Sequence, residues 1–195
     1  DVERSRGLGD VYKRQMYDPC CGSGTVLIEG ALLANNIAPG INRNFDVDRW
    51  GFIPESVWMS ERERCRDLIK TDTDFVAFGT DIDPKAIELT LKNAKNIGVD
   101  KFIRASVADI KNFDPTTERG TLITNPPYGE RMLDVREAEK IYRIMGDKFV
   151  AKHGWSYGII SPDEEFEKCF GRKADKRRKL YNGMIKCQYY ICLLY

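Results

Sequence analysis

Residues 75–98, FVAFGTDIDPKAIELTLKNAKNIG, contain a β-strand, a turn and an α-helix in one run. The apolar stretch 75–80 has the length and composition of a buried strand, and residues 84–97 repeat apolar side chains at helical spacing. Pro84 suits the first position of that helix, Asp83 can cap it, and Gly98 is typical of its end. A strand followed directly by a helix is the repeating unit of a parallel α/β sheet.

The same alternation continues along the chain in both directions. We expect helices over residues 25–36 and 134–152, and strands near 102–107, 120–124 and 156–161. The C-terminal part breaks the rhythm: β-prone residues 176–181 and 184–194 flank Asn182-Gly183, a dipeptide that favours a type I′ turn. The sequence therefore predicts an α/β protein whose mostly parallel sheet is closed by an antiparallel hairpin.

Length and composition limit the class of protein. The 195 residues suffice for one globular domain, and 42% hydrophobic residues with a net charge of +1 exclude a disordered chain. No apolar run is long enough for a membrane span, and no signal peptide is evident. The six cysteines form no CxxC pair and His153 is the single histidine, so we expect reduced thiols in a cytoplasmic protein, with no metal site and no histidine base.

Two segments interrupt the α/β pattern. Residues 1–15 are highly charged and are interpreted as a truncated or non-native leader, so that the domain covers residues 16–195 and its first strand, at Met16, is short. Residues 36–73 form an insertion with many aromatic side chains and a charged helix over residues 55–70. We expect this insertion to cover one edge of the sheet, and the alternative is that Trp50 or Phe52 stacks on a base.

Three polar positions at strand ends indicate a ligand site. In DPCCGSGT, residues 18–25, glycines at 22 and 24 let the backbone turn sharply and approach a ligand next to a helix N-terminus. Asp81 could accept hydrogen bonds from both ribose hydroxyls, and Asp109 from the exocyclic amine of adenine. A structural turn or a helix cap is the alternative for each of them. A nicotinamide site is disfavoured because Leu27 stands where that fingerprint requires Gly or Ala.

The motif Asn125-Pro126-Pro127-Tyr128 follows the predicted strand 120–124. Consecutive prolines stiffen the loop, so that the side-chain carbonyl of Asn125 and the main-chain carbonyl of Pro126 can act as two fixed acceptors. Such a pair suits an aromatic amine, and Tyr128 can stack on the base that carries it. A rigid turn without function is the simpler alternative for two prolines alone.

With these motifs in this order, Met16–Tyr195 resembles class I S-adenosylmethionine-dependent methyltransferases of the amino-methylating kind. The resemblance implies a Rossmann-like, seven-stranded sheet, S-adenosyl-L-methionine as cofactor, and residues 125–128 as the catalytic (N/D)PPY motif. It assigns the glycine loop to the methionine moiety, Asp81 to the ribose, and Ile82 and Asp109 to the adenine. The implied cofactor-binding residues are Asp18, Cys20, Gly22, Gly24, Thr25, Asp81, Ile82, Asp109 and Asn125.

Three further stretches are similar to a bacterial branch that methylates guanine N2 of large-subunit (23S) ribosomal RNA: IAPGINRNF at 37–45, NPPYGER at 125–131 and GRKADKRRKLYNG at 171–183. Members of that branch usually carry an RNA-binding THUMP domain, which we expect to be absent here. Methylation of adenine N6 in DNA, and a non-catalytic RNA-binding module, are the alternatives. The oligomeric state is not predicted.

Contact with RNA must come from local charge, because the chain as a whole is nearly neutral. Six basic residues within 171–181 stand against Asp175 alone, a footprint suited to phosphates. A solvated face is the alternative. The predicted RNA-binding residues are Arg172, Lys173, Lys176, Arg177, Arg178 and Lys179, together with Arg131 beyond the catalytic motif.

Overall fold

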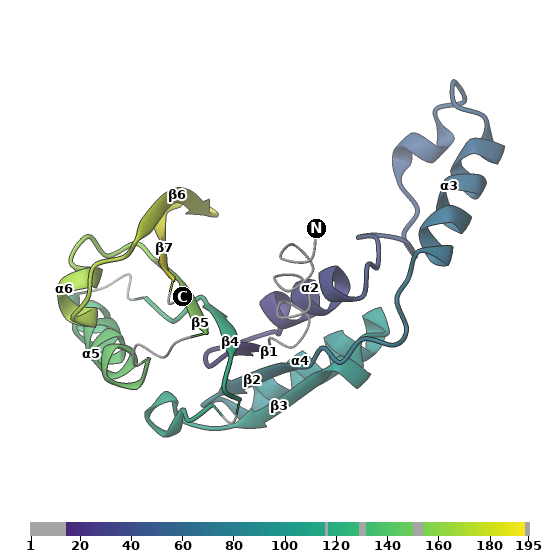
Figure 1. Ribbon diagram of the computed structural model, residues 1–195. Helices are drawn as coiled ribbons and strands as arrows, with labels where there is room; N and C mark the ends of the chain where they lie inside the picture. Colours follow the sequence, from purple (N-terminus) through teal and green to yellow (C-terminus); the bar gives the residue numbers. More distant parts are fainter. Residues whose placement is uncertain (1–14, 116, 129–131, 150–153, 194–195) are drawn as a thin grey trace, which may run out of the picture.

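The computed structural model describes residues 15–115, 117–128, 132–149 and 154–193. A seven-stranded sheet with the order β3-β2-β1-β4-β5-β7-β6 forms its centre (Figure 1). Strand β7 is antiparallel to both of its neighbours, and the other pairs are parallel. The strands are β1 (Gln15–Asp18), β2 (Ala77–Asp81), β3 (Ile103–Val107), β4 (Gly120–Thr124), β5 (Trp155–Ser161), β6 (Lys176–Asn182) and β7 (Ile185–Leu193). The predicted parallel sheet with a closing hairpin is confirmed.

Helices cover both faces of the sheet. The helices are α2 (Thr25–Ala34), α3 (Glu55–Asp67), α4 (Pro84–Ile97), α5 (Met132–Lys148) and α6 (Phe166–Phe170), with short 3-10 turns η1 (Asp46–Arg49), η2 (Asp100–Phe102) and η3 (Ile110–Asn112). An aliphatic core that contains Met16 lies under α2 and α4. A second, aromatic core that contains Tyr17 lies under α5 and α6. Neighbouring residues of a strand point to opposite faces, so the short strand β1 contributes to both cores.

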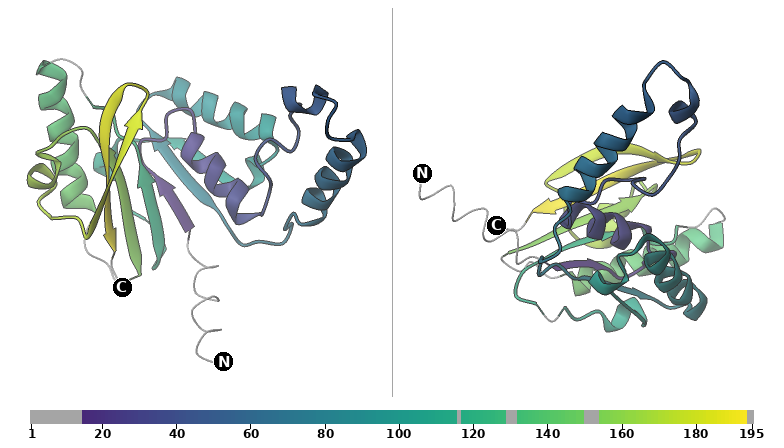
Figure 2. Two further views of the ribbon diagram at one scale, coloured as in Figure 1. Left: turned by 90° about the horizontal axis from the view of Figure 1, so that it is seen from above. Right: turned by 90° about the vertical axis from the view of Figure 1, so that its right-hand side faces the viewer.

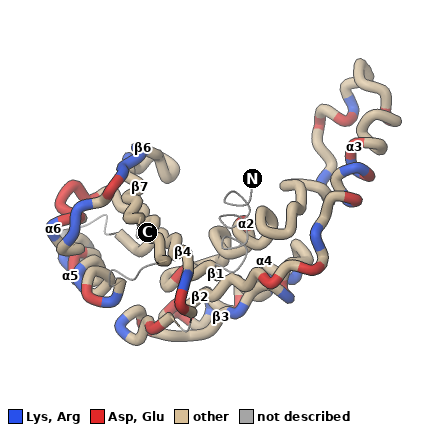
Figure 3. Tube along the Cα trace, viewed as in Figure 1, with Lys and Arg blue, Asp and Glu red and all other residues tan. Residues whose placement is uncertain are grey.

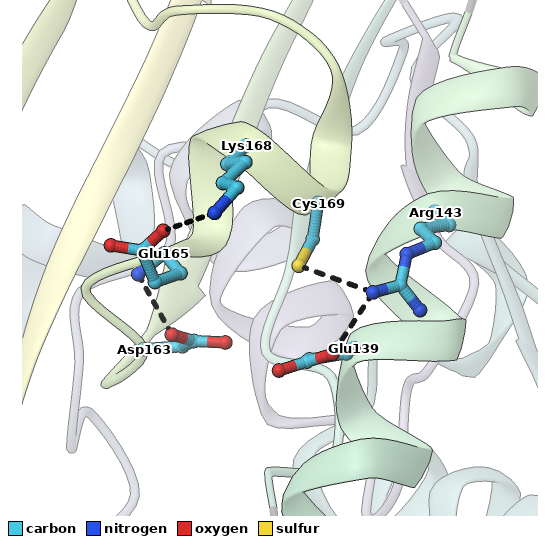
Figure 4. A network of polar contacts seen from close by, with 6 residues as sticks. All are labelled: Glu139, Arg143, Asp163, Glu165, Lys168 and Cys169. Atoms are coloured by element: carbon cyan, nitrogen blue, oxygen red, sulfur yellow. Dashed lines mark hydrogen bonds and ion pairs between the residues drawn. The ribbon is translucent and has the colours of Figure 1, made fainter.

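Helix α6 is held against α5 by aromatic and polar contacts. Phe166 of α6 packs edge-to-face on Tyr142 of α5, with ring centroids 5.0 Å apart. At the surface, Arg143 donates to Glu139 at 2.9 Å and lies 4.0 Å from the sulfur of Cys169 (Figure 4). These contacts join α6 to α5 on the same face of the sheet.

The hairpin turn differs from the prediction. Asn182 pairs with Ile185 in the β6–β7 ladder, so the two loop residues are Gly183 and Met184 rather than Asn182 and Gly183. Gly183 has a φ of 60°, whereas Met184 is not at positive φ, as in a type II′ turn. The prediction of a type I′ turn is therefore wrong, because glycine at the first loop position suffices for the right-handed twist of the strands.

The insertion does not cover the sheet edge. Residues 36–73 project away from the sheet as an arm that contains η1 and α3 (Figures 1 and 2). Neither element contains a buried residue, and Trp50 and Phe52 are 62% and 69% exposed. The expectation of a packed cover is wrong because α3 carries charged residues around its circumference and has no continuous apolar face. The helix itself begins after Pro54, as predicted.

The first described residue, Gln15, already belongs to a strand. Gln15 is the first residue of β1, and its side chain accepts a hydrogen bond from the backbone of Val76 and donates one to that of Asp74. Residues 1–14 of the expected leader lie outside the described residues, as do Arg131 and His153. Within the part of the chain that the structure describes, no helix combines the length and apolar character that a membrane crossing needs.

Candidate active site

A cavity of about 760 Å³ opens at the carboxyl ends of β1, β2 and β4. This volume is typical of a binding site for a small molecule or cofactor. One wall comes from the loops that follow the strands, and the other comes from α5. The lining residues are Pro19, Cys20, Gly22, Asp81, Ile82, Ala108, Asp109, Ile110, Lys111, Asn125, Pro127, Glu137, Lys140, Ile141 and Ile144.

The glycine loop forms the floor of this cavity and is held from behind by α4. Gly22 and Gly24 have φ angles of 54° and 82°, which side chains rarely adopt. A Cβ on Gly24 would lie 2.7 Å from a methyl carbon of Thr90, whereas one on Gly22 would meet no protein atom within 4 Å. Thr90 donates to the carbonyl of Gly22 at 2.8 Å, and Asn93 to that of Ser23 at 3.0 Å. The backbone is therefore fixed at a point where a ligand can approach it.

Asp81 joins the end of β2 to the glycine loop. Its Oδ2 accepts from the backbone amide of Gly22, and its Oδ1 from that of Asp83, both at 3.0 Å. A carboxylate has about four acceptor sites, so Asp81 retains capacity for two hydroxyl groups. Asp83 instead accepts from the amide of Lys85 at 2.9 Å and caps α4, as predicted.

Asp109 has a similar double role. Its Oδ1 accepts from the amide of Lys111 at 2.9 Å and caps η3, and the residue also lines the cavity. The two interpretations of this residue, a helix cap and a ligand contact, are therefore compatible.

Asp18 lies behind the cavity and connects its two functional loops. It is only 2% exposed, and its Oδ1 accepts from the amide of Cys20 at 3.1 Å and from the hydroxyl of Thr124 at 2.7 Å. Thr124 directly precedes the Asn125 loop, so one carboxyl holds the start of both loops. Burial raises the pKa of Asp18 to about 7, because removal from water disfavours the charged form and the two hydrogen bonds oppose this only in part.

This raised pKa predicts a pH dependence of stability. Above pH 7 Asp18 is ionised in the native and unfolded states, and burial of the charge costs about 4 kcal/mol; below pH 4 it is neutral in both and the cost vanishes. The Asp18 contribution to stability is thus present at low pH and lost as the pH rises from 4 to 7. Asp18→Asn keeps the accepting oxygen, so we expect it to raise the free energy of unfolding most at pH 8 and by less than half as much at pH 5. Urea denaturation at the two pH values measures this, and an equal effect at both would contradict a charged Asp18.

The Asn125–Tyr128 loop forms the rim of the cavity. Pro126 is buried, while Asn125 and Pro127 line the cavity. The Oδ1 atom of Asn125 is buried, and no described residue donates a hydrogen bond to it. Tyr128 is half-buried, and its hydroxyl accepts a hydrogen bond from Nδ2 of Asn182. An unpartnered buried acceptor is costly, and a donor on a ligand bound beside Asn125 would remove that cost.

The structure brings together most of the predicted cofactor residues. Cys20, Gly22, Asp81, Ile82, Asp109 and Asn125 line one cavity. Asp18 and Gly24 are buried behind it. Thr25 begins α2 and lines a separate groove beside β1, so the structure does not place it at the cavity.

Sequence reasoning missed the contribution of two helices. On α5, Glu137, Lys140, Ile141 and Ile144 line the cavity, and their helical spacing shows a shared face but not what that face meets. On α4, Thr90 is buried on the same stripe as Ile87 and Ala94. A polar residue on an apolar stripe was the signal that could have identified Thr90.

The predicted RNA-binding residues differ in their surroundings. The guanidinium of Arg172 lies over the rings of Tyr157 and Phe170, and Arg177 forms an ion pair with Glu167. Lys173, which precedes β6, is exposed, and so are Lys176, Arg178 and Lys179 on β6. Acidic residues lie nearby around α6 (Figure 3). The exposed positive charge without an ion pair among the described residues is therefore smaller than the sequence indicates. It lies at Lys173, Lys176, Arg178 and Lys179, and the ammonium of Lys179 also lies 5.2 Å from the ring centroid of Tyr181.

The residues around the cavity fit an adenosyl cofactor. The Asp81 carboxylate can accept further hydrogen bonds, and the space beside Gly22 contains no protein atom within 4 Å of the point where a Cβ would lie. A sheet with this strand order and a cavity at its carboxyl ends belongs to a class I S-adenosylmethionine-dependent methyltransferase domain. Within this class, the chain belongs to the family of RMKL-like methyltransferase domains, whose sequence pattern matches residues 9–191.

Individual relatives agree with this assignment. The chain is 38% identical to YpsC of Bacillus subtilis (strain 168), named as an RNA methyltransferase, over 91% of this chain and 46% of YpsC. It is 41% identical to the ribosomal RNA large subunit methyltransferase K/L of Shewanella pealeana, over 91% of this chain and 26% of that protein. The solved structure of SMU.472 in complex with SAH superimposes with a TM-score of 0.87 at 38% identity, over 92% of this chain and 48% of that one. The chain thus spans half or less of these relatives' lengths.

Proposed function

We propose that this domain transfers a methyl group from S-adenosyl-L-methionine to the exocyclic N2 of a guanine in 23S ribosomal RNA. The observation that carries the proposal is that Asn125 lines the cavity and that its buried Oδ1, an acceptor, has no donor among the described residues. An aromatic amine supplies the missing donor. The names of the relatives, an RNA methyltransferase and a large-subunit rRNA methyltransferase, support ribosomal RNA as the substrate.

The cofactor, when bound, supplies an electrophilic methyl group on a sulfonium. The backbone at Gly22 receives its methionine part, Asp81 accepts from its ribose hydroxyls, and Ile82 and Asp109 contact its adenine. Two backbone amides already orient Asp81, so its side chain loses little conformational entropy when the cofactor binds.

At the rim, Asn125 and the carbonyl of Pro126 hold the substrate amine, and Tyr128 stacks on its base. Extrusion of the base from its stack costs a few kcal/mol, which this stacking and the two acceptors offset. A new N–C bond forms as the S–C bond breaks. The methylated nitrogen then loses a proton to solvent, so the step needs no histidine base.

The RNA backbone is proposed to bind exposed cations on β6 and on the segment that precedes it. These cations are Lys173, Lys176, Arg178 and Lys179. Arg131, Arg172 and Arg177 complete the proposed set, although Arg172 and Arg177 also make contacts within the protein. Phosphate contacts position a nucleic acid but do not select its sequence.

A tritiated-methyl assay that offers ribosomal RNA and duplex DNA side by side tests this function. We expect label in RNA, located at guanine N2 after digestion to nucleosides. Label only in DNA, at adenine N6, would contradict the proposal, since the same acceptor pair can hold either amine. Binding of ribosomal RNA with no calorimetric binding of S-adenosylhomocysteine and no transfer would instead indicate a non-catalytic RNA-binding module.

A further inference from the structure

We propose that Asn182, at the end of β6, is a positioning residue that sets the orientation of the Tyr128 ring for base stacking. This inference rests on the proposed function, because it concerns how the rim of that site is built. Asn182 and Tyr128 are 54 positions apart in the chain, yet Nδ2 of Asn182 donates to the hydroxyl of Tyr128.

The register of the hairpin makes this contact possible. Asn182 pairs with Ile185, so the turn is made by Gly183 and Met184. Asn182 is therefore not needed at positive φ, where the sequence pattern placed it, and its backbone is that of a strand end. Its side chain can then reach out of the hairpin to the catalytic loop.

The surroundings of Tyr128 show that its hydroxyl end is held by the hairpin. Tyr128 is half-buried, and burial together with the nearby Cys187 of β7 raises the pKa of its hydroxyl, while hydrogen bonds with Asn182 and Asn125 oppose the rise. The hydroxyl oxygen of a tyrosine lies on the long axis of its ring, so a hydrogen bond at this atom fixes χ1 and with it the direction in which the ring points. Asn182 and Asn125 thus both interact with the hydroxyl end of the ring.

This contact also joins two parts of the proposed RNA site. The strand that ends at Asn182 carries the exposed cations Lys176, Arg178 and Lys179. The proposed RNA has a base on Tyr128 and a phosphate backbone along β6. Because β6 is hydrogen-bonded into the sheet, the distance between these two contact points is fixed. Without the hydrogen bond from Asn182 the Tyr128 ring would be mobile. Stacking of the base would then be weaker, because fixing the ring on binding costs conformational entropy.

A double-mutant cycle tests this role. The variants are Asn182→Ala, Tyr128→Phe and both together, with Met184→Ala as control, since Met184 lies in the same turn and is 97% exposed. If Asn182 acts through the hydroxyl of Tyr128, each single variant should lower kcat about tenfold, and the double variant about tenfold rather than about a hundredfold. The Kd for S-adenosylhomocysteine and the Tm should stay at wild-type values, and Met184→Ala should behave as wild type.

An NMR measurement makes the inference testable without activity. In protein labelled with carbon-13 at the tyrosine Cζ, the Tyr128 signal is identified by its absence in Tyr128→Phe, and we expect it to shift in Asn182→Ala but not in Met184→Ala. Additive losses of kcat would overturn the proposal and indicate that Asn182 contacts the RNA directly. An unshifted Tyr128 signal would overturn it as well. Absence of methyl transfer by the wild type would contradict the proposed function alone, and the NMR result would still decide the contact.

Discussion

Replacement of Asn125 by alanine should lower methyl transfer about a hundred- to a thousandfold, while the affinity for S-adenosylhomocysteine stays within about twofold of wild type. The reason is that the buried Oδ1 of Asn125 has no donor among the described residues and is proposed to accept a hydrogen bond from the incoming amine. An acceptor aimed at the position where charge develops contributes mainly to the transition state. Single-turnover transfer and calorimetry measure the two quantities separately.

Asn125→Asp is the matched control for this prediction. It keeps the shape of the side chain and an accepting oxygen, so we expect it to retain much more activity than the alanine variant. Equal methyl incorporation by wild type and Asn125→Ala would rule out the proposed role. A parallel loss of cofactor affinity and turnover would instead assign Asn125 to cofactor binding only.

Replacement of Asp81 by alanine should weaken the binding of S-adenosylhomocysteine at least about a hundredfold. The variant loses the carboxylate proposed to accept the ribose hydroxyls, and it also removes the partner of the Gly22 amide at 3.0 Å. The floor of the cavity then loses one of the bonds that hold it. Calorimetric titration of the folded variant measures the effect.

Asp83→Ala provides the comparison two positions along the chain. Asp83 caps α4 through the amide of Lys85, so its loss should cost about 1 kcal/mol of stability and change cofactor affinity little. If both variants weakened binding to the same degree, a general effect on the β2–α4 turn would explain the loss. That result would remove Asp81 from the cofactor site.

Positions at strand ends were predictable because the sheet is parallel. Asp81, Asp109 and Asn125 each follow an apolar strand, and the carboxyl ends of parallel strands meet at one edge. The cavity lined by all three residues confirms that they converge. What each of them binds stays a prediction, because the same carboxylates also cap helices and hold backbone amides.

The failed expectations have a different origin. Trp50 and Phe52 were expected to be buried because they are large and apolar, but the residues between them and the sheet form an arm without an apolar face. Burial needs a partner surface, and composition does not show whether one exists. The turn contains Met184 and not Asn182, because the register of β6 and β7 determines which residues form the loop, and the Asn182-Gly183 dipeptide does not.

Local chemistry along the chain determined the alternation of strands and helices, the glycines at positive φ, the cap at Asp83 and the stiff loop at residues 125–128. These depend on neighbours in sequence, and their physical causes act over a few residues. Only the tertiary structure decided that Thr90 holds the glycine loop, that α5 closes the cavity, and that Asn182 bonds Tyr128. Such contacts join residues tens of positions apart, and they exist only once the packing of the two cores has set the distances between elements.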